Sequence, residues 1–285
     1  MIIVITGPTG VGKTKLSIAL AKKYNGIIVN ADSMQVYKRL NIGTAKIKEE
    51  EKENIPHYLF DIKKPDEMYT VFDYQKDLRK ILNEHKEKNI IIVGGTGLYI
   101  KAGLYNYEFE EESKTQNNYD NYSNEEIYKI LKEKDPNTNI HINNRKRIIR
   151  ALNTDFQNNN KKHELLYDAI FIGLTTNRDN LYKIINDRVD NMFENGLLEE
   201  VELLYNEKIY GKSIATGIGY KELYAYFDNK ISLEEAKELI KKNSRHYAKR
   251  QYTWFNNQMD INWFETNYDD FNKTINEIVA FIEKE

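Results

Sequence analysis

The segment from Gly7 to Thr14 constrains the fold of this chain more than any other feature. It reads Gly-Pro-Thr-Gly-Val-Gly-Lys-Thr and fits the phosphate-loop pattern G-x₄-G-K-[ST] at every position. An apolar run from Ile2 to Thr6 precedes it, and the residues from Lys13 to Tyr24 are typical of a helix. A strand, a glycine loop and a helix in this order predict an α/β fold with a parallel sheet.

The same segment predicts the kind of ligand that binds there. Glycines allow backbone amides to close around phosphate oxygens, and the N-terminus of the following helix adds partial positive charge. We expect Lys13 to neutralise an outer phosphate and Thr14 to hold Mg²⁺. The predicted diphosphate-binding residues are Gly7, Pro8, Thr9, Gly10, Val11, Gly12, Lys13 and Thr14. The pattern indicates a di- or triphosphate, but it does not identify the rest of the compound.

Further strands and helices alternate along the chain. Residues 27–31, 90–93 and 168–175 are apolar runs typical of buried strands, and Thr70 can cap a helix that follows it. The C-terminal third is mainly helical in pattern, and Ser232 with Glu235 predicts the start of a long helix that reaches Trp254. We therefore predict a P-loop NTPase-like parallel sheet flanked by helices. Ligands of such sheets bind beyond the carboxyl ends of the strands.

The middle of the chain has a different composition and predicts a small, mainly helical insertion. Residues 107–166 are polar and rich in Asn, Lys and Tyr, whereas 1–106 and 167–285 carry the α/β pattern. Ser123 followed by Glu126 predicts a capped helix that ends near Lys134. A basic helix over residues 143–152 should follow, and residues 158–162 have the composition of a linker.

Two polar residues follow the predicted strands. Asp32 comes after the strand 27–31, where it could cap a helix, hold Mg²⁺ through water, or act as a general base toward a nucleophile approaching the bound phosphoester. The position alone leaves these three roles open. Thr96 lies in Gly94-Gly95-Thr96-Gly97 after the next strand, where the glycines permit a ligand to approach the backbone. By itself this second motif is a weak indicator.

Composition limits the remaining possibilities. The 285 residues include no cysteine, which excludes disulfides, cysteine-ligated zinc and a thiol nucleophile. No apolar stretch is long enough to cross a membrane, and the N-terminal apolar run lacks a cationic leader, so we expect a cytoplasmic protein without membrane association. The net charge is only −2, yet cations gather in residues 145–150 and 241–250. Such clusters can bind a polyanion or can simply be solvated helix faces. The oligomeric state is not determined by the sequence, and a monomer is our expectation.

Taken in order, these segments resemble the tRNA dimethylallyltransferase family. The phosphate loop is followed by Ala-Asp-Ser-Met-Gln-Val-Tyr-Lys from Ala31, Ile-Gly-Thr-Ala-Lys from Ile42 and Gly-Gly-Thr-Gly-Leu-Tyr from Gly94. Pro56-His57-Tyr58-Leu59 with Asp61, the segment from Ile140 to Leu152, Ile218-Gly219-Tyr220-Lys221-Glu222 and residues 247–255 also resemble motifs of that family. The similarity extends over nearly the whole chain.

The resemblance implies a function and assigns roles to residues. It implies that the loop holds dimethylallyl diphosphate, that the acceptor is the exocyclic amine of an adenosine 3′ of the tRNA anticodon, and that Mg²⁺ assists. It implies that Asp32 is the general base, that Thr96 contacts the target base, and that Lys13 stabilises the leaving diphosphate. Residues matching the tRNA site are Asp32, Ser33, Met34, Gln35 and Thr96, with Arg145, Arg147, Arg150, Arg245, Lys249 and Arg250 expected to grip the backbone of the anticodon stem-loop.

Some features of the chain depart from the family pattern, and other functions compete with this one. The insertion is short, and Ile142 and Asn153 replace the proline and glutamate usual in the family. These differences concern the grip on tRNA more than the chemistry. A P-loop nucleotide kinase is the main alternative, and a prenyltransferase acting on free AMP or ADP is another. A nucleotide-gated RNA-binding protein without transfer activity is a third.

Overall fold

The computed structural model describes residues 1–109, 117–153 and 164–285. The chain divides into two compact units. One consists of Met1–Leu104 with Leu165–Glu285, and the other of Tyr105–Glu164. Each boundary of the smaller unit lies slightly N-terminal to the one expected for the insertion. The expected linker at 158–162 falls outside the described residues.

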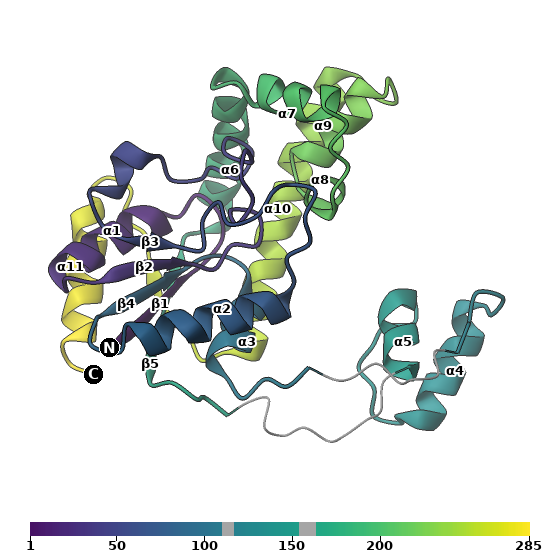
Figure 1. The fold of residues 1–285 in the computed structure, drawn as a ribbon, viewed down its shortest axis with the longest axis horizontal. Coiled ribbons are helices and arrows are strands. Elements are labelled where there is room, and N and C mark those ends of the chain that lie inside the picture. The colour runs from purple at the N-terminus through teal and green to yellow at the C-terminus, as the bar shows by residue number, and fades with distance from the viewer. Residues whose placement is uncertain (110–116, 154–163) are drawn as a thin grey trace. The chain divides into compact units, whose positions relative to one another are not determined.

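The larger unit is built on one six-stranded parallel sheet (Figure 1). Its strand order is β3-β2-β4-β1-β5-β6, and every strand pair is parallel. The central strands are buried because helices cover both faces, as the apolar runs of the sequence predict. The strands are β1 (Ile2–Thr6), β2 (Ile27–Asn30), β3 (His57–Tyr58), β4 (Ile90–Val93), β5 (Ala169–Thr175) and β6 (Asn262–Glu265).

Helices pack on the sheet and extend beyond it. Helices α1, α2, α3 and α11 lie against the sheet, whereas α6 to α10 form a helical part at the carboxyl ends of the strands (Figure 1). The helices are α1 (Lys13–Lys23), α2 (Val71–Glu84), α3 (Gly97–Leu104), α6 (Arg178–Glu194), α7 (Leu197–Asn206), α8 (Lys212–Thr216), α9 (Tyr220–Phe227), α10 (Leu233–Gln258) and α11 (Phe271–Ile282), with a 3₁₀ turn at Glu49–Lys52.

The starts of several helices are fixed by their own side chains. Thr70 Oγ1 accepts the backbone N–H of Asp73, whose carboxylate in turn accepts the N–H of Thr70. Ser232 and Glu235 form the same reciprocal pair at the start of α10. Both helix starts were predicted from the sequence and are confirmed. These bonds satisfy backbone donors that a helix leaves unpaired in its first turn.

The order of the strands differs from a simple sequential arrangement. Strand β4 lies between β1 and β2, so the strand before Asp32 is not the direct neighbour of the strand before the phosphate loop. The strands β3 and β6 were not predicted. They are short edge strands, and β6 carries exposed polar residues, so neither has the apolar run on which the prediction depended. The carboxyl ends of β1, β4 and β2 nevertheless meet at one edge of the sheet.

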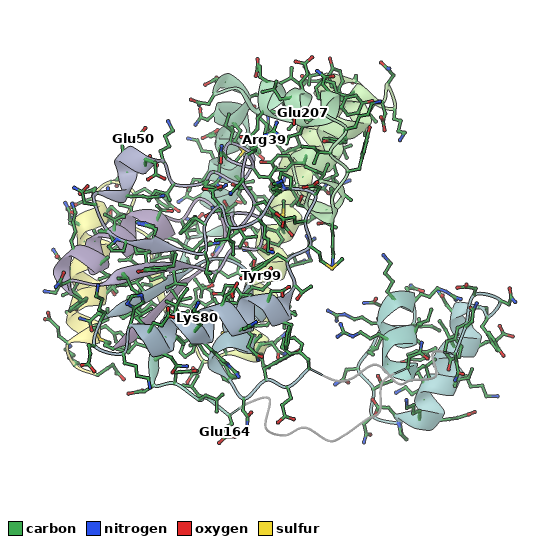
Figure 2. The ribbon with its side chains drawn as sticks, in the orientation of Figure 1. Arg39, Glu50, Lys80, Tyr99, Glu164 and Glu207 are labelled. Atoms are coloured by element: carbon green, nitrogen blue, oxygen red, sulfur yellow. The ribbon has the colours of Figure 1, made fainter. Side chains whose placement is uncertain are left out.

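A long connection between β2 and β3 reaches toward α7. Arg39 in the connection makes a two-bond ion pair with Glu207 at the end of α7, with N–O distances of 2.6 and 2.7 Å (Figure 2). Both side chains remain largely exposed. The connection therefore bridges the sheet and the helical part.

The smaller unit has an apolar cluster of its own. Its helices α4 (Asn124–Lys134) and α5 (Arg145–Leu152) pack against each other. Ser123 caps α4 with the predicted partner Glu126. The predicted basic helix begins two residues later than expected because Asn144 caps it. The buried residues of the cluster are Tyr119, Ile127, Leu131, Ile148 and Leu152.

Candidate active site

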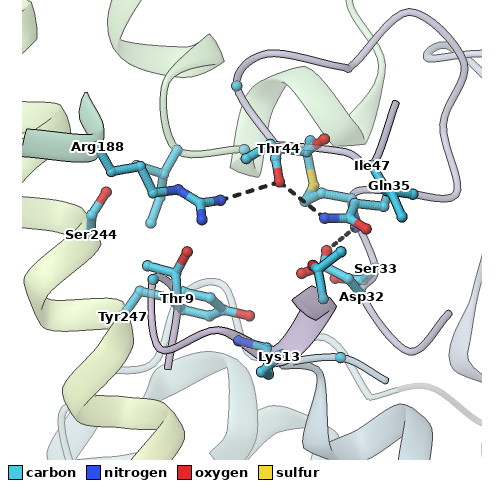
Figure 3. Close-up of a pocket in the computed structure, with 18 of the residues that line it drawn as sticks. Thr9, Lys13, Asp32, Ser33, Gln35, Thr44, Ile47, Arg188, Ser244 and Tyr247 are labelled. Carbon is cyan, nitrogen blue, oxygen red and sulfur yellow. Dashed lines mark hydrogen bonds between the residues drawn. The ribbon is translucent and has the colours of Figure 1, made fainter. Parts of the chain in front are cut away.

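A cavity of 590 Å³ opens beside the phosphate loop at the carboxyl edge of the sheet. Figure 3 shows Thr9 and Lys13 on one side of it and Thr44 and Arg188 on the opposite side. The loop after β1, the connection after β2, and helices α6, α8 and α10 all contribute side chains. The polar residues that line it include Thr9, Lys13, Thr14, Asp32, Ser33, Gln35, Thr44, Arg188, Lys221, Ser244, Tyr247, Arg250 and Gln251.

The phosphate loop has the backbone that its glycines were predicted to provide. Gly7 and Gly12 have φ angles of 135° and 94°, in the region that favours glycine. The side chain of Lys13 folds back over the loop, and its Nζ donates to the carbonyls of Gly7 at 2.9 Å and Pro8 at 2.6 Å. The lysine of the loop is thus held against the loop's own backbone carbonyls.

The charge of Lys13 is weakened by its surroundings. The pKa of Lys13 is lowered to about 7, mainly by burial and also by the positive charge of Arg188, while the negative charge of Asp32 opposes the change. Burial also lowers the pKa of Arg188 itself, again against Asp32. Asp32 offsets these two positive charges only in part, so the site favours a ligand that brings negative charge.

Thr14 lies at the first turn of α1, where its side chain is exposed and lines the cavity. Among the described residues, no group of three or more His, Asp or Glu side chains could hold a metal ion. A metal at this point would therefore take most of its ligands from a bound phosphate and from water, with the Thr14 hydroxyl as a protein ligand. This donor set fits Mg²⁺, which retains waters and binds together with substrate phosphates.

Asp32 lines the cavity with one carboxylate oxygen left available. Its Oδ1 accepts the backbone N–H of Met34 at 2.8 Å, and its own N–H donates to Asn30 at 2.9 Å. Within the part of the chain that the structure describes, nothing donates to its second oxygen, Oδ2. Asp32 therefore caps a turn through one oxygen and presents the other to the cavity. No helix begins at Asp32 in the described residues, so the helix-cap reading of the sequence is wrong, whereas the second oxygen leaves the base reading open.

Thr96 lies behind the cavity rather than in its lining. Its Oγ1 accepts the N–H of Ser33 at 3.0 Å and donates to the Ser33 hydroxyl at 3.2 Å. The predicted site residues Ser33, Met34 and Gln35 do line the cavity. Thr96 thus holds the segment after Asp32 through Ser33.

Several residues that line the cavity were not proposed from the sequence as site residues, among them Arg188, Tyr247 and Gln251. Arg188 lies in the interior of α6, where no motif marks it, and its Nη2 is 3.5 Å from the carbonyl of Thr44. Tyr247 and Gln251 face the cavity from α10. Burial raises the pKa of Tyr247, and so does the charge of Asp32, although hydrogen bonds with Thr96 and Gln251 lower it. Membership in the 247–255 motif was the signal that could have identified the last two.

The cations expected to grip RNA do not all have the same environment. Arg245 donates to Asn186 at 2.6 Å, which joins α10 to α6. Lys249 and Arg250 are exposed, and Arg250 lines the cavity. In the smaller unit, Arg145 donates to the carbonyls of Tyr119 and Tyr122 and so braces its own unit. Arg147 and Arg150 lie on the exposed surface of α5.

No helix within the described ranges is both long and apolar enough to cross a membrane.

The family profile, the similar sequences and the similar solved structures all indicate the same family. The sequence profile of the family described as IPP transferase matches residues 35–258. A tRNA dimethylallyltransferase from Anoxybacillus flavithermus is 47% identical, with 99% of this chain and 96% of that protein covered. One from Bacillus licheniformis is 48% identical over 93% of this chain and 90% of the relative.

Solved structures are similar along their length as well. The tRNA isopentenylpyrophosphate transferase of Bacillus halodurans has a TM-score of 0.77 and 41% identity, with 99% of this chain and 95% of that chain covered. A eukaryotic dimethylallyltransferase captured acting on tRNA has a TM-score of 0.81 at 28% identity, covering 99% of this chain and 78% of its own. The family expected from the sequence motifs is confirmed, and this chain belongs to the IPP transferase family.

Proposed function

We propose that this chain transfers a dimethylallyl group from dimethylallyl diphosphate to the N6 amine of the adenosine 3′ to the anticodon in tRNA, with release of diphosphate. One observation carries the proposal: a single cavity holds both the phosphate loop and the available carboxylate oxygen of Asp32. The names of the relatives, tRNA dimethylallyltransferase and tRNA isopentenylpyrophosphate transferase, support this donor and this acceptor.

The donor fits the cavity in two parts. Its diphosphate would lie on the loop amides between Lys13 and Arg188, because both cations face the space above the loop. Its hydrocarbon part would lie against apolar side chains of α6 and α10. Those that line the cavity include Ile185, Val189, Met192 and Ile240.

Mg²⁺ would complete the donor site. The Thr14 hydroxyl and the diphosphate oxygens would hold the ion, which neutralises the charge that grows on the departing diphosphate. Lys13, Arg188 and the loop amides act in the same direction.

The transfer requires a proton acceptor for the amine. The C–O bond of the donor breaks and diphosphate leaves with its electron pair, while the N6 lone pair forms the new C–N bond. An adenine amine is a poor nucleophile because its lone pair is delocalised into the ring. Asp32 would accept the proton that the amine loses, through the oxygen not engaged by Met34.

The acceptor would enter from the side of the connection after β2. We assign the residues from Asp32 to Gln35 to the target nucleotide, with Thr96 acting on it through its hydrogen bonds to Ser33, and Lys249 and Arg250 to the flanking phosphates. Arg147 and Arg150 of the smaller unit would contact the tRNA backbone, whereas Arg145 and Arg245, which pair within the protein, would hold the helices that carry RNA-binding cations. A base in the anticodon loop can be unstacked into such a cavity at modest cost.

Mass analysis of the RNA product tests the proposal. The protein is incubated with Mg²⁺, dimethylallyl diphosphate and an anticodon stem-loop, and the RNA is expected to gain one dimethylallyl group without ATP. Parallel reactions contain AMP as acceptor or ATP as donor. Faster modification of AMP than of the stem-loop, or phosphate transfer from ATP, would establish one of the alternative activities instead.

A further inference from the structure

The carboxylate of Glu200 in α7 accepts hydrogen bonds from a loop that is distant in sequence, within the connection after β2. Its Oε2 accepts the backbone N–H groups of Asn41 at 2.9 Å and Ile42 at 2.8 Å. Its Oε1 accepts the N–H of Gly43 at 3.1 Å and the hydroxyl of Tyr220 at 2.7 Å. All four partners are donors, so the site matches a group that can only accept hydrogen bonds. An ionised carboxylate meets that requirement, and a neutral amide does not.

Close packing fixes the same loop against α9. A Cβ atom at Gly43 would lie only 2.7 Å from the ring and the hydroxyl oxygen of Tyr220. The loop backbone can therefore approach Tyr220 only because residue 43 is glycine. The ring is fully buried, and the loop rests on a rigid surface.

The far end of the loop has a second anchor. Lys46 is almost fully buried, and its Nζ donates to the carbonyl of Tyr37 at 2.6 Å and to Asp61 Oδ1 at 2.6 Å. Residues 41–46, which we call the roof loop, are thus held by a carboxylate at one end and an ammonium at the other. Both charges are paired with groups that satisfy them.

The roof loop covers the donor side of the cavity. Gly43, Thr44 and Ala45 all line it. The carbonyl of Thr44 accepts Gln35 Nε2 at 3.0 Å, and Arg188 Nη2 lies 3.5 Å from the same oxygen. Figure 3 shows both contacts at Thr44, opposite the phosphate loop. The position of this carbonyl therefore influences where the guanidinium of Arg188 lies.

We infer that Glu200 is a positioning residue of the donor site. Its carboxylate holds the roof loop so that the Thr44 carbonyl keeps Arg188 facing the diphosphate across the cavity. Glu200 does not line the cavity, and it acts through the loop. The inference rests on the proposed function in that it takes the ligand between Lys13 and Arg188 to be a diphosphate.

The chain offers a matched pair of substitutions for the test. Glu200→Gln places an amide NH₂ among four donors, whereas Glu207→Gln alters the exposed pair with Arg39. Both positions belong to the α7 region and both contact the connection after β2, but only Glu200 holds the roof loop. Exposed ion pairs contribute little to stability. Glu207→Gln therefore controls for the change of a glutamate to glutamine in this region when the roof loop is left undisturbed.

Two measurements are made on each variant, well below the temperature at which either unfolds. Isothermal titration calorimetry gives the Kd for inorganic diphosphate with Mg²⁺, and hydrogen exchange with mass analysis follows the amides of residues 41–43. We expect Glu200→Gln to weaken diphosphate binding at least ~10-fold and to speed exchange of those amides by a similar factor. Glu207→Gln should remain within about twofold of the parent in both.

The kinetic readout separates positioning from simple stability. Glu200→Gln should raise the KM for dimethylallyl diphosphate while the KM for the stem-loop stays close to that of the parent. A variant that unfolds more easily but binds diphosphate like the parent would overturn the inference, because Glu200 would then be structural only. If Glu200→Gln weakens diphosphate binding as expected but the parent protein prenylates no RNA, the proposed function is refuted and the positioning role of Glu200 remains.

Tyr220→Phe gives a second route if Glu200→Gln does not fold. It removes one hydrogen bond of the carboxylate and keeps the buried ring. We expect ~3-fold weaker diphosphate binding and faster exchange at Gly43. Unchanged values of both in a folded Tyr220→Phe variant would count against the inference.

Discussion

At the scale of single residues, Asp32 divides its two carboxylate oxygens between structure and chemistry. One oxygen accepts the N–H of Met34, and the other is available in the cavity. Asp32→Asn keeps an oxygen for the turn but cannot accept a proton at neutral pH. We expect the rate of a single turnover to fall by ~10²–10⁴-fold, with little change in donor affinity.

The comparison of two substitutions at Asp32 makes this test sharper. Asp32→Ala removes the turn bond as well, so it should lose as much rate as the asparagine variant and some stability in addition. Quenched-flow mixing with labelled donor measures the rate, and calorimetry measures donor binding. An asparagine variant that turns over like the parent would show that Asp32 is not the base.

Lys13 should make donor binding depend on pH. Its pKa in the free protein is lowered to about 7, mainly by burial, and a bound diphosphate favours the charged form and so raises that pKa. Above about pH 7 the complex therefore holds more protons at Lys13 than the free protein does. Donor affinity should fall as the pH rises through this range, whereas below it Lys13 is charged in both states.

Calorimetry in two buffers of different ionisation enthalpy measures the proton taken up by Lys13. At about pH 8 the parent should take up a fraction of a proton on binding the donor. Lys13→Met provides the baseline, since the donor's own ionisation contributes equally in both proteins. Equal proton uptake by the two would contradict the assignment to Lys13.

At the scale of secondary-structure elements, the contact between α3 and α10 depends on one glycine. A Cβ atom at Gly97 would collide with the indole ring of Trp254. Gly97→Ala should therefore destabilise the fold by ~1–3 kcal/mol through overpacking. Urea unfolding measures this, and Leu98→Ala, at an exposed neighbouring position, should change the free energy of unfolding by less than about 0.5 kcal/mol. If Gly97→Ala leaves the free energy of unfolding unchanged, Trp254 moves aside to accept the methyl group.

Local elements were predictable because their signals are local. The caps at Thr70, Ser123 and Ser232 follow from short-range hydrogen bonds, and the structure has all three. The position of β4 between β1 and β2 depends on long-range pairing that no nearby residue encodes. Arg188 was missed for the same reason, since only the fold brings α6 to the phosphate loop.

At the scale of the whole molecule, the apolar cores and the basic residues are divided between two units. The larger unit holds the cavity and the exposed Lys249 and Arg250. The smaller unit has its own cluster around Ile127 and Ile148 and carries the basic helix α5. Donor binding should therefore depend on the larger unit alone, whereas RNA binding should use cations of both.

Two arginines on α5 allow this division to be tested. Arg145 braces the smaller unit through the carbonyls of Tyr119 and Tyr122, whereas Arg147 is exposed. Arg147→Gln should lower affinity for the stem-loop and reduce the slope of log K against log salt by about one contact, with the donor Kd unchanged. Arg145→Gln should instead destabilise the smaller unit, which hydrogen exchange of α4 detects. If the salt slope of Arg147→Gln equals that of the parent, α5 does not contact RNA, and the basic character of this helix reflects a solvated face.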